Sequence, residues 1–271
     1  AGWAGFSVAG GRIRGIRTES GLSVRARIWL DCSYEGDLLA AAGCSYVVGR
    51  EANAEFDERH DGIQHASAVK HQFGAAVDPW QRPGDPASGL LPGIESEDAT
   101  PDGSKDDRVQ AYCYRLCAAR APAPRVPFAR PDGYDERDYE LLLRWFDSGA
   151  TLPPWDPAAL PNRKTDSNNN GPVSMDGIGA AWSWAEASYD ERARLGTAQR
   201  HWQQGLLWTL AHHPRVPLAV REHFAGYGLA ADEFVANGHW PPLVYVREAR
   251  RLRGEVVVNE RHCTGELVAD D

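Results

Sequence analysis

The sequence predicts a mixed α/β protein, with an α+β arrangement of its own elements, and three observations support this prediction. Residues 1–30 read as a β-meander that leads into a strand–turn–helix segment at 31–43. A capping signal at residue 188 opens a long helix with an apolar stripe. Between them, residues 75–135 are rich in Pro, Gly and Asp, which predicts irregular chain that is functional or wraps a surface.

The meander is predicted from a pair of glycines. Residues 6–9 and 12–17 flank Gly10 and Gly11, which is the signal of a two-residue hairpin turn. Residues 22–30 then alternate polar and apolar side chains, which predicts a further strand. That strand is expected to run directly into the turn that begins at residue 31.

The turn after residue 30 predicts a helix N-terminus that faces a phosphate. It reads Asp-Cys-Ser-Tyr-Glu-Gly-Asp over residues 31–37, and Gly43 can end the helix that follows. Free backbone N–H groups at a helix start face one spot, which suits the phosphate of a nucleotide. Gly36 would let the backbone approach a cofactor closely. Asp37 would hold a ribose or ribitol hydroxyl, or would simply cap the helix.

The later elements are predicted from their start and stop signals. Asp135 can cap a helix that ends at Gly149. The long helix that opens with the capping box at Ser188 ends at His212-His213-Pro214. Pro217 starts another helix. Residues 243–246 are apolar and predict a strand.

A polar run at 162–171 supplies the first group of candidate substrate contacts. Such a run is typical of a solvated loop, but its density of donors and acceptors also suits a sugar or a carboxylate. The candidate residues are Asn162, Arg163, Lys164, Asp166, Asn168 and Asn169.

The segment 108–117 supplies the second group. Its alternation predicts a strand with Val109, Ala111 and Cys113 on one face, and with Gln110, Tyr112 and Tyr114 on the other. The polar and aromatic face could line a substrate pocket, or could belong to an ordinary half-exposed strand. The candidate residues are Gln110, Tyr112 and Arg115.

Arginine is concentrated in residues 245–254, and Arg247 is the candidate there. The guanidinium fork suits a pyrophosphate or a carboxylate. The alternative is a set of surface ion pairs that contribute little to stability.

Composition excludes several classes of function. The net charge of −9 argues against nucleic acid as a partner. No apolar run is long enough for a membrane span. The five cysteines are odd in number and irregularly spaced, so a disulfide framework is not expected, and the histidines lack the spacing of metal ligands. The compartment, cytoplasmic or exported, stays open.

Four segments together resemble one family, the FAD-dependent oxidoreductases of the glutathione-reductase-like superfamily, some of which are labelled xanthan lyase-like. The segments are 31–51, which contains a match to D-x-T/S-Y-E-G-D-L, and then 110–117, 161–171 and 245–254 in the family's order. A meander that feeds a phosphate-facing turn is also typical of two-dinucleotide-type flavoprotein folds, although this is an analogy between folds.

The resemblance implies a partial two-dinucleotide-type FAD-binding fold with a helical, loop-rich inserted substrate region. Residues 1–50 would belong to the FAD-binding domain, 51–240 to the insertion, and 241–271 to the return into that domain. FAD would contact Ser33, Glu35, Gly36, Asp37 and Arg247.

Family members also begin with a glycine-rich strand–turn–helix and close with a second cofactor-contacting segment. Residues 1–271 contain neither, so we expect an internal fragment that needs the missing N- and C-terminal segments of its own chain as partners.

The functional interpretation therefore has three alternatives. The first is a piece of an FAD-dependent oxidoreductase that acts on a polar small molecule, for which a sugar-related compound is the candidate. The second is a carbohydrate-active lyase, in which Tyr112, His71 and Arg115 would abstract a proton next to a carboxylate. The third is a non-catalytic ligand-binding fragment. No residue of the sequence can be singled out as the catalytic acid or base.

Overall fold

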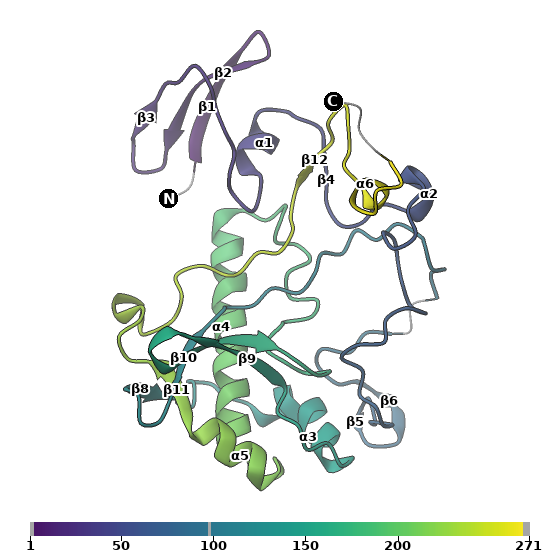
Figure 1. Ribbon diagram of the computed structural model, residues 1–271, viewed down its shortest axis with the longest axis vertical. Coiled ribbons are helices and arrows are strands. Elements are labelled where there is room, and N and C mark those ends of the chain that lie inside the picture. Colours follow the sequence, from purple (N-terminus) through teal and green to yellow (C-terminus); the bar gives the residue numbers. More distant parts are fainter. Residues whose placement is uncertain (1–2, 97–98, 268–271) are drawn as a thin grey trace.

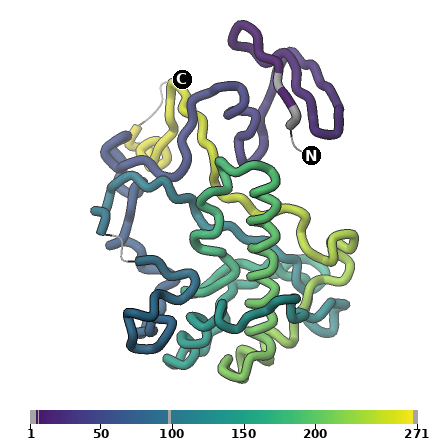
Figure 2. Tube along the Cα trace, turned by 180° about the vertical axis from the view of Figure 1, so that it is seen from behind, coloured from purple at the N-terminus to yellow at the C-terminus, as the bar shows by residue number. Residues whose placement is uncertain are grey.

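The computed structural model describes residues 3–96 and 99–267. It has two parts, which Figures 1 and 2 show from opposite sides. We call the larger one the body: it contains the long helix α4 (Tyr189–His212), the helices α3 (Glu140–Asp147) and α5 (Leu218–Ala225), and a five-stranded sheet. We call the rest the upper part: it contains the meander and the chain around helices α1 (Asp37–Ala41), α2 (Asn53–Phe56) and α6 (Glu260–Cys263).

The meander is confirmed, but its last strand is much shorter than the alternation predicts. Its antiparallel strands are β1 (Trp3–Ala9), β2 (Arg12–Thr18) and β3 (Ser23–Val24), and the predicted glycine pair forms the first turn with positive φ at both residues. The prediction of a strand over 22–30 is wrong beyond Val24. Ile28 and Leu30 are each 77% exposed, so the alternating apolar side chains are not buried there and do not stabilise a strand. Trp29 instead donates its indole N–H to the Ile13 carbonyl of β2 at 3.1 Å.

The sheet of the body consists of antiparallel pairs only, which agrees with the predicted α+β arrangement. Two of its strands lie inside the segment predicted to be irregular, and so does a separate hairpin. In spatial order the sheet strands are β8 (Arg125–Pro127), β11 (Tyr227–Ala230), β7 (Cys117–Arg120), β10 (Lys164–Asn169) and β9 (Trp155–Leu160), and the hairpin pairs β5 (Trp80–Arg82) with β6 (Asp85–Leu90).

The polar run at 162–171 is mostly strand β10 and not a solvated loop. It is hydrogen-bonded to β7 on one side and to β9 on the other. Thr165 and Ser167 alternate into the buried face, where Ser167 is fully buried. A short 3-10 turn, η2 (Pro161–Arg163), precedes the strand.

The helices of the body begin and end close to their predicted signals. The Asp135 side chain accepts a hydrogen bond from the Arg137 amide at the start of a 3-10 turn, η1 (Glu136–Tyr139), which continues into α3. The Ser188 side chain accepts from the Glu191 amide at 3.2 Å and caps α4. The helix predicted from Pro217 is α5, for which that proline is the N-cap.

The main apolar core lies between α3, α4, α5 and the sheet. Leu142 of α3, Leu206 of α4 and Phe224 of α5 are each completely buried in it. A second, smaller cluster contains Tyr112, Trp184 and Val246 and lies toward the upper part. Burial of apolar area is therefore the main force that holds the body together.

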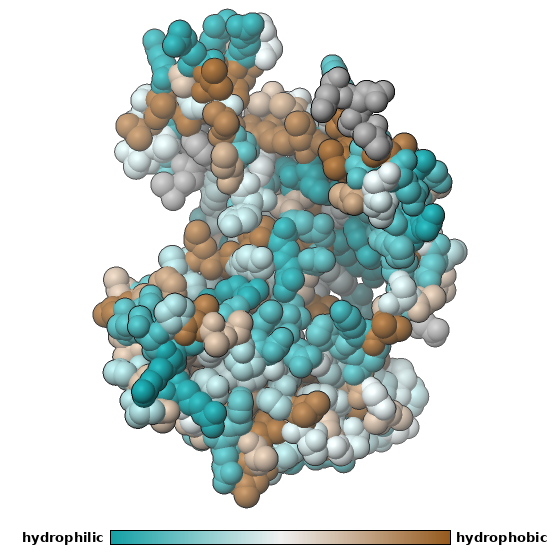
Figure 3. Space-filling model, in the orientation of Figure 1, coloured by the Kyte–Doolittle hydropathy of each residue, from teal (hydrophilic) through white to brown (hydrophobic). Residues whose placement is uncertain are grey.

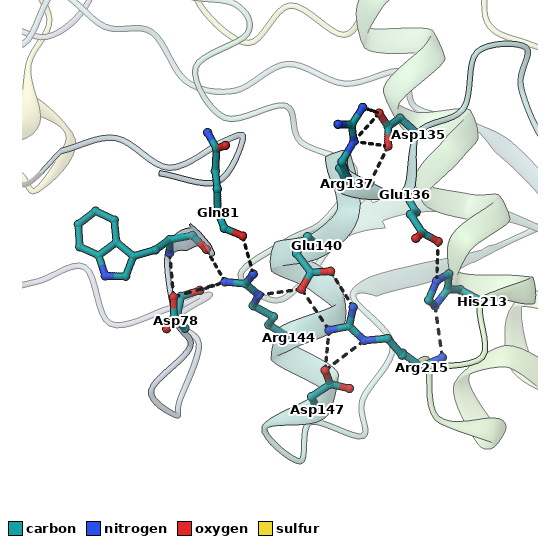
Figure 4. Close-up of polar contacts among 11 residues, drawn as sticks. Asp78, Gln81, Asp135, Glu136, Arg137, Glu140, Arg144, Asp147, His213 and Arg215 are labelled. Atoms are coloured by element: carbon teal, nitrogen blue, oxygen red, sulfur yellow. Dashed lines mark hydrogen bonds and ion pairs between the residues drawn. The ribbon is translucent and has the colours of Figure 1, made fainter. Parts of the chain in front are cut away.

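Arg144 of α3 holds the β5–β6 hairpin against the body (Figure 4). Its guanidinium donates to the backbone carbonyls of Asp78 and Trp80 at 3.0 and 2.7 Å, and pairs with Glu140 at 2.7 Å. Glu140 is also bonded to Arg215, which reaches Asp147 at the end of α3. This network explains how a loop-rich segment is kept in a defined place without much apolar burial of its own.

In the upper part the chain returns beside its own beginning. Strand β12 (Arg251–Leu252) pairs with β4 (Tyr46–Val47), and α6 lies near α2. A 3-10 turn, η3 (Val235–Asn237), precedes this return. The strand predicted at 243–246 is wrong: only Tyr245 forms a bridge there, to Cys113, and the apolar residues Val244 and Val246 instead pack in the second cluster. Within the described residues, no helix combines the length and the apolar character that crossing a membrane requires.

Candidate functional site

The turn at 31–37 is stabilised from within. Asp31 accepts hydrogen bonds from the Ser33 amide at 3.0 Å and from the Leu39 amide of α1 at 3.0 Å. The Ser33 hydroxyl accepts from the Gly36 amide at 3.1 Å. Partial burial acts to raise the pKa of Asp31, but these hydrogen bonds lower it below its ordinary value. The expectation of free amides that face a phosphate is therefore wrong for these three groups: the Asp31 carboxylate accepts from the amides of Ser33 and Leu39, and the Ser33 hydroxyl accepts from the amide of Gly36.

Asp37 joins three distant segments. Its carboxylate accepts from both terminal nitrogens of Arg192 in α4, at 2.7 and 2.8 Å, and from Arg250 at 2.7 Å. The Tyr189 hydroxyl lies 3.2 Å from it. Burial acts to raise the pKa of Asp37, but the hydrogen bonds from Arg192 and Arg250 lower it overall. We call Asp37, Arg192 and Arg250 the Asp37 triad.

The neighbours of Asp37 in the motif serve the same junction. The Trp184 indole donates to the Glu35 carboxylate at 3.3 Å, and Arg250 donates to the Glu35 carbonyl at 3.2 Å. Gly36 has φ +66, and a Cβ added there would lie 3.2 Å from the Cβ of Arg250. Gly36 therefore allows close approach of the backbone, as predicted, but the group that approaches is Arg250.

An open pocket of about 580 Å³ lies beside this junction. Its lining includes Gly5 of the meander together with Asp37, Tyr189, Arg192 and Arg250. Figure 3 shows the notch between the meander and the body. The charged groups of the pocket are paired with one another, and the turn amides are bonded to Asp31 and Ser33. The amides of Ser33, Gly36 and Leu39 and the guanidinium groups of Arg192 and Arg250 are thus already bonded within the chain, and as they stand they do not fit a pyrophosphate.

A second group of predicted residues does come together, around Tyr245. Arg115 binds Asp166 through two hydrogen bonds, one of them 3.0 Å long. Arg247 binds Asp176 at 3.0 Å. The guanidinium carbons of Arg115 and Arg247 lie 5.2 and 5.7 Å from the centre of the Tyr245 ring. We call these five residues the arginine cluster.

Backbone contacts explain why the cluster forms. The Tyr245 amide donates to the Cys113 carbonyl at 2.8 Å, and the Gly177 amide donates to the Tyr112 carbonyl at 3.2 Å. Residues 112 and 113 therefore lie between the segments that carry Tyr245 and Asp176. Strand β10 brings Asp166 to Arg115, because Leu116 and Ser167 exchange hydrogen bonds at 2.8 and 3.1 Å.

The segment 108–116 is not a strand, which corrects the predicted faces. Tyr112 and Cys113 are both buried although they are consecutive in the sequence. Burial and then the charge of Asp176 raise the pKa of the Cys113 thiol to about 12. Burial likewise raises the pKa of Tyr112 above its ordinary value, and its hydroxyl donates to the Glu248 carbonyl. Both groups are therefore neutral and structural.

The remaining predicted substrate contacts lie elsewhere. Lys164 pairs with Asp232 and Glu233. Asn162 and Arg163 are exposed in the turn η2. The other candidates are Gln110, which is exposed and whose amide donates to Glu248, and Asn168 and Asn169, which are half-buried at the end of β10 beside β9.

Sequence reasoning missed Asp176, Tyr245, Arg192 and Arg250 as members of these groups. Tyr245 and Arg250 lie in the arginine-rich segment that the sequence did single out. No local signal marks Asp176 or Arg192, because each acquires its role from a partner more than sixty residues away. Of the set proposed for a lyase, Tyr112 donates to the Glu248 carbonyl, the His71 ring accepts from the Gly171 amide at 3.1 Å, and Arg115 is paired with Asp166.

One family model, described as FAD dependent oxidoreductase, matches residues 2–271. No curated protein and no solved structure matches the chain significantly. The match covers nearly every residue and includes both the Asp37 triad and the arginine cluster. The chain therefore belongs to the FAD dependent oxidoreductase family, whose cofactor is FAD.

Proposed function

We propose that this protein takes part in the FAD-dependent oxidation or reduction of a polar small molecule, which the arginine cluster recognises. The family match over residues 2–271 is the observation that carries the general class. In such enzymes the flavin carries the redox chemistry, while the protein supplies binding, orientation and electrostatics.

The composition of the arginine cluster supports a polar substrate. Arg115 and Arg247 keep 30% and 26% of their side chains exposed, so a ligand can reach both. Each guanidinium is oriented by one carboxylate, and the two acids balance the two positive charges. Donors, acceptors and the half-exposed ring of Tyr245 therefore lie together without a large net charge. This combination suits a hydroxyl-rich molecule such as a sugar better than a strongly charged one.

Arg247 is the residue of the cluster that we propose to contact the substrate. Its Nε is buried and has no hydrogen-bond partner in the described part of the chain. Because that atom is buried, a ligand would contact the rest of the guanidinium, on a side chain that is 26% exposed and that Asp176 holds in place. This is the role we propose for Arg247, in place of a contact with FAD.

We also propose the finer features of FAD binding that the family resemblance implies. They are the two-dinucleotide-type fold, the division at residues 50 and 240, and FAD contacts near Ser33, Glu35, Gly36 and Asp37. The notch beside the Asp37 triad supports a ligand in that region. Cofactor contacts there would require Arg192 or Arg250 to exchange a bond with Asp37 for one with the cofactor.

The test compares two arginine variants in the flavin-loaded protein. A panel of sugars and polyols is screened anaerobically for bleaching of the flavin absorption band. Arg247→Met is expected to lower kcat/KM for the best substrate by about 10- to 100-fold, because a hydrogen bond to a charged group contributes about 1.5–3 kcal/mol. Arg163→Met is the matched control, since Arg163 is exposed and outside the cluster.

Two outcomes would contradict the proposal. If Arg247→Met and Arg163→Met have the same kcat/KM, the arginine cluster does not recognise the substrate. If the protein neither binds FAD nor reduces it with any compound of the panel, the oxidoreductase function of this chain is refuted.

A further inference from the structure

A pocket of about 380 Å³ lies on the body and shares one lining residue, Asp176, with the arginine cluster. Helix α4, the start of α3 and the segments 92–93 and 172–180 enclose it. Its walls are mainly apolar: they include Leu141, Val173, Ile178 and Trp202. This size and character are typical of a small-molecule site.

The inner wall of the pocket carries an unpaired hydrogen-bond acceptor. Gln199 of α4 is only 7% exposed. Its amide nitrogen donates to the Met175 carbonyl at 3.1 Å and toward Gln203 Oε1 at 3.4 Å. Its Oε1 accepts no hydrogen bond from any residue in the described ranges. This oxygen is not fully buried, so a ligand or a water molecule in the pocket can donate a hydrogen bond to it.

The orientation of this amide is fixed by its neighbours. Gln203 accepts from the Tyr114 amide at 2.7 Å and donates to the Tyr114 carbonyl at 3.1 Å. The Gln203 oxygen therefore faces the Gln199 amide group and requires a nitrogen there. Met175 offers a carbonyl, which requires a nitrogen as well. Only the oxygen of Gln199 is left to face the pocket.

Gly177 keeps the space in front of that oxygen open. A Cβ at position 177 would lie 2.1 Å from Gln199 Oε1, which is an impossible contact. Gly177 also lines the pocket. A glycine here is explained by close approach and not by its backbone angles, since φ is not in the left-handed region.

The remaining polar groups that line the pocket determine which charge a bound ligand can carry. Ser174 is 6% exposed and its hydroxyl has no partner among the residues that the structure describes. The charged residues of the lining are Asp138 and Asp176, of which Asp176 is already paired with Arg247. The lining that the structure describes contains no Lys, Arg or His. An anion would therefore find no positive charge there, whereas a hydroxyl or an ammonium group would find acceptors.

We propose that this pocket binds a compact, mainly apolar molecule that carries one hydroxyl or ammonium group, and that this group donates a hydrogen bond to Gln199 Oε1. The apolar walls would cover the body of the ligand. The proposal does not depend on the flavin or on the proposed reaction, because it follows from the lining of the pocket alone.

Four probes that share one ring test the head group. Benzyl alcohol, benzylamine, toluene and benzoate are each titrated into the full chain, and binding is followed by ligand-observed NMR and by Trp fluorescence. We expect benzyl alcohol and benzylamine to bind about 3- to 10-fold more tightly than toluene, which lacks the donor. Benzoate is expected to bind most weakly. Asp138→Asn distinguishes the hydroxyl group from the ammonium group, because loss of the carboxylate charge should weaken the binding of benzylamine only.

Two variants on exposed positions of α4 locate the binding. Ala198 is exposed and lines the pocket, so Ala198→Phe should fill the entrance, leave the melting temperature nearly unchanged, and abolish binding of all probes. Ala193 is exposed on the same helix but does not line the pocket, so Ala193→Phe should retain binding. Gln199→Leu should remove the preference for benzyl alcohol over toluene.

The proposal is overturned if all four probes bind equally, if neither benzyl alcohol nor benzylamine binds up to its solubility limit, or if Ala198→Phe binds as the unmodified protein does. None of these results would affect the flavin function, because the assay contains no FAD and measures no turnover.

Discussion

The body and the upper part of this molecule are held together by different forces. In the body, three helices and a sheet enclose a continuous apolar core, with Leu142, Leu206 and Phe224 fully buried. In the upper part, short elements are joined mainly by ion pairs such as those of the Asp37 triad. Burial determines whether the body is folded, whereas the ion pairs determine where the upper part lies relative to it. Four predictions test this comparison.

The largest effect is expected from the core of the body. Leu142→Ala leaves a cavity at a site with no exposed surface, so it should lower the free energy of unfolding by about 2–5 kcal/mol in urea denaturation. Leu152, which is 71% exposed, provides the control, and Leu152→Ala should change stability by less than about 0.5 kcal/mol. Equal effects of the two variants would show that α3 does not pack as described.

Breaking the Asp37 triad should have a smaller and more local effect. Asp37→Asn leaves Arg192 and Arg250 without their carboxylate, although each side chain is only 8% exposed. We expect a loss of about 2–3 kcal/mol in the local stability of α1, read by hydrogen exchange, while amides of α3 keep their protection. Asp57→Asn removes an ion pair whose carboxylate is 86% exposed, and should have almost no effect. A concerted loss of protection in α3 would refute the separation of the two parts.

Two glycines beside α1 distinguish backbone strain from side-chain contact. Gly36 and Gly43 both have positive φ, +66 and +75, so alanine at either position should cost about 1 kcal/mol. Only Gly36 also faces Arg250, and Gly36→Ala should therefore cost up to about 1 kcal/mol more. Thermal melts and exchange of the α1 amides measure both. Identical values would mean that Arg250 moves away without penalty.

The smallest effect concerns pH. Burial, and then the charges of Glu58 and Glu51, raise the pKa of Asp61 to about 6. The folded state therefore holds this proton more tightly than the unfolded state, in which the pKa is about 3.9. The contribution of Asp61 to stability around α2 should be greatest below about pH 4 and should be lost as the pH rises through 6. Asp61→Asn should remove up to about 1 kcal/mol of this loss, a figure reduced for solvent screening.

Exchange of the α2 amides at several pH values measures this dependence. Asp190→Asn, at an exposed position at the start of α4, serves as the control. A stability that rises between pH 4 and 7 in the unmodified protein, and not in Asp61→Asn, would reverse the predicted sign.

The parts of the fold that were predictable are those with local signals. Ser188 and Asp135 mark the starts of α4 and of the η1–α3 pair within a few residues of the chain. The glycine pair at 10–11 marks the first hairpin in the same way. Strand β10 could not be recognised, because its polar residues take their strand conformation from β7 and β9, and β7 lies over forty residues away.

The same distinction applies to the candidate site. Three residues of the arginine cluster could be predicted from the sequence by their type, namely Arg115, Asp166 and Arg247. In the structure they lie around Tyr245. The contacts of Glu35 and Asp37 could not be predicted from the sequence, because their partners Trp184 and Arg192 belong to a distant segment. The prediction of a strand over 108–117 is wrong for a related reason. Its alternation is regular, but bridges to residues 177 and 245 bury consecutive side chains.

One contact of α4 bears on the position of Arg115 in the arginine cluster. The Gln203 side chain bonds both the amide and the carbonyl of Tyr114, as a neighbouring strand would do. Rotation of α4 by a single residue would swing this side chain by about 100° and break both bonds. These two hydrogen bonds therefore fix the rotation of α4 about its own axis relative to residue 114. Arg115 is therefore fixed from two sides: by helix α4 through Tyr114, and by strand β10 through the hydrogen bonds between Leu116 and Ser167.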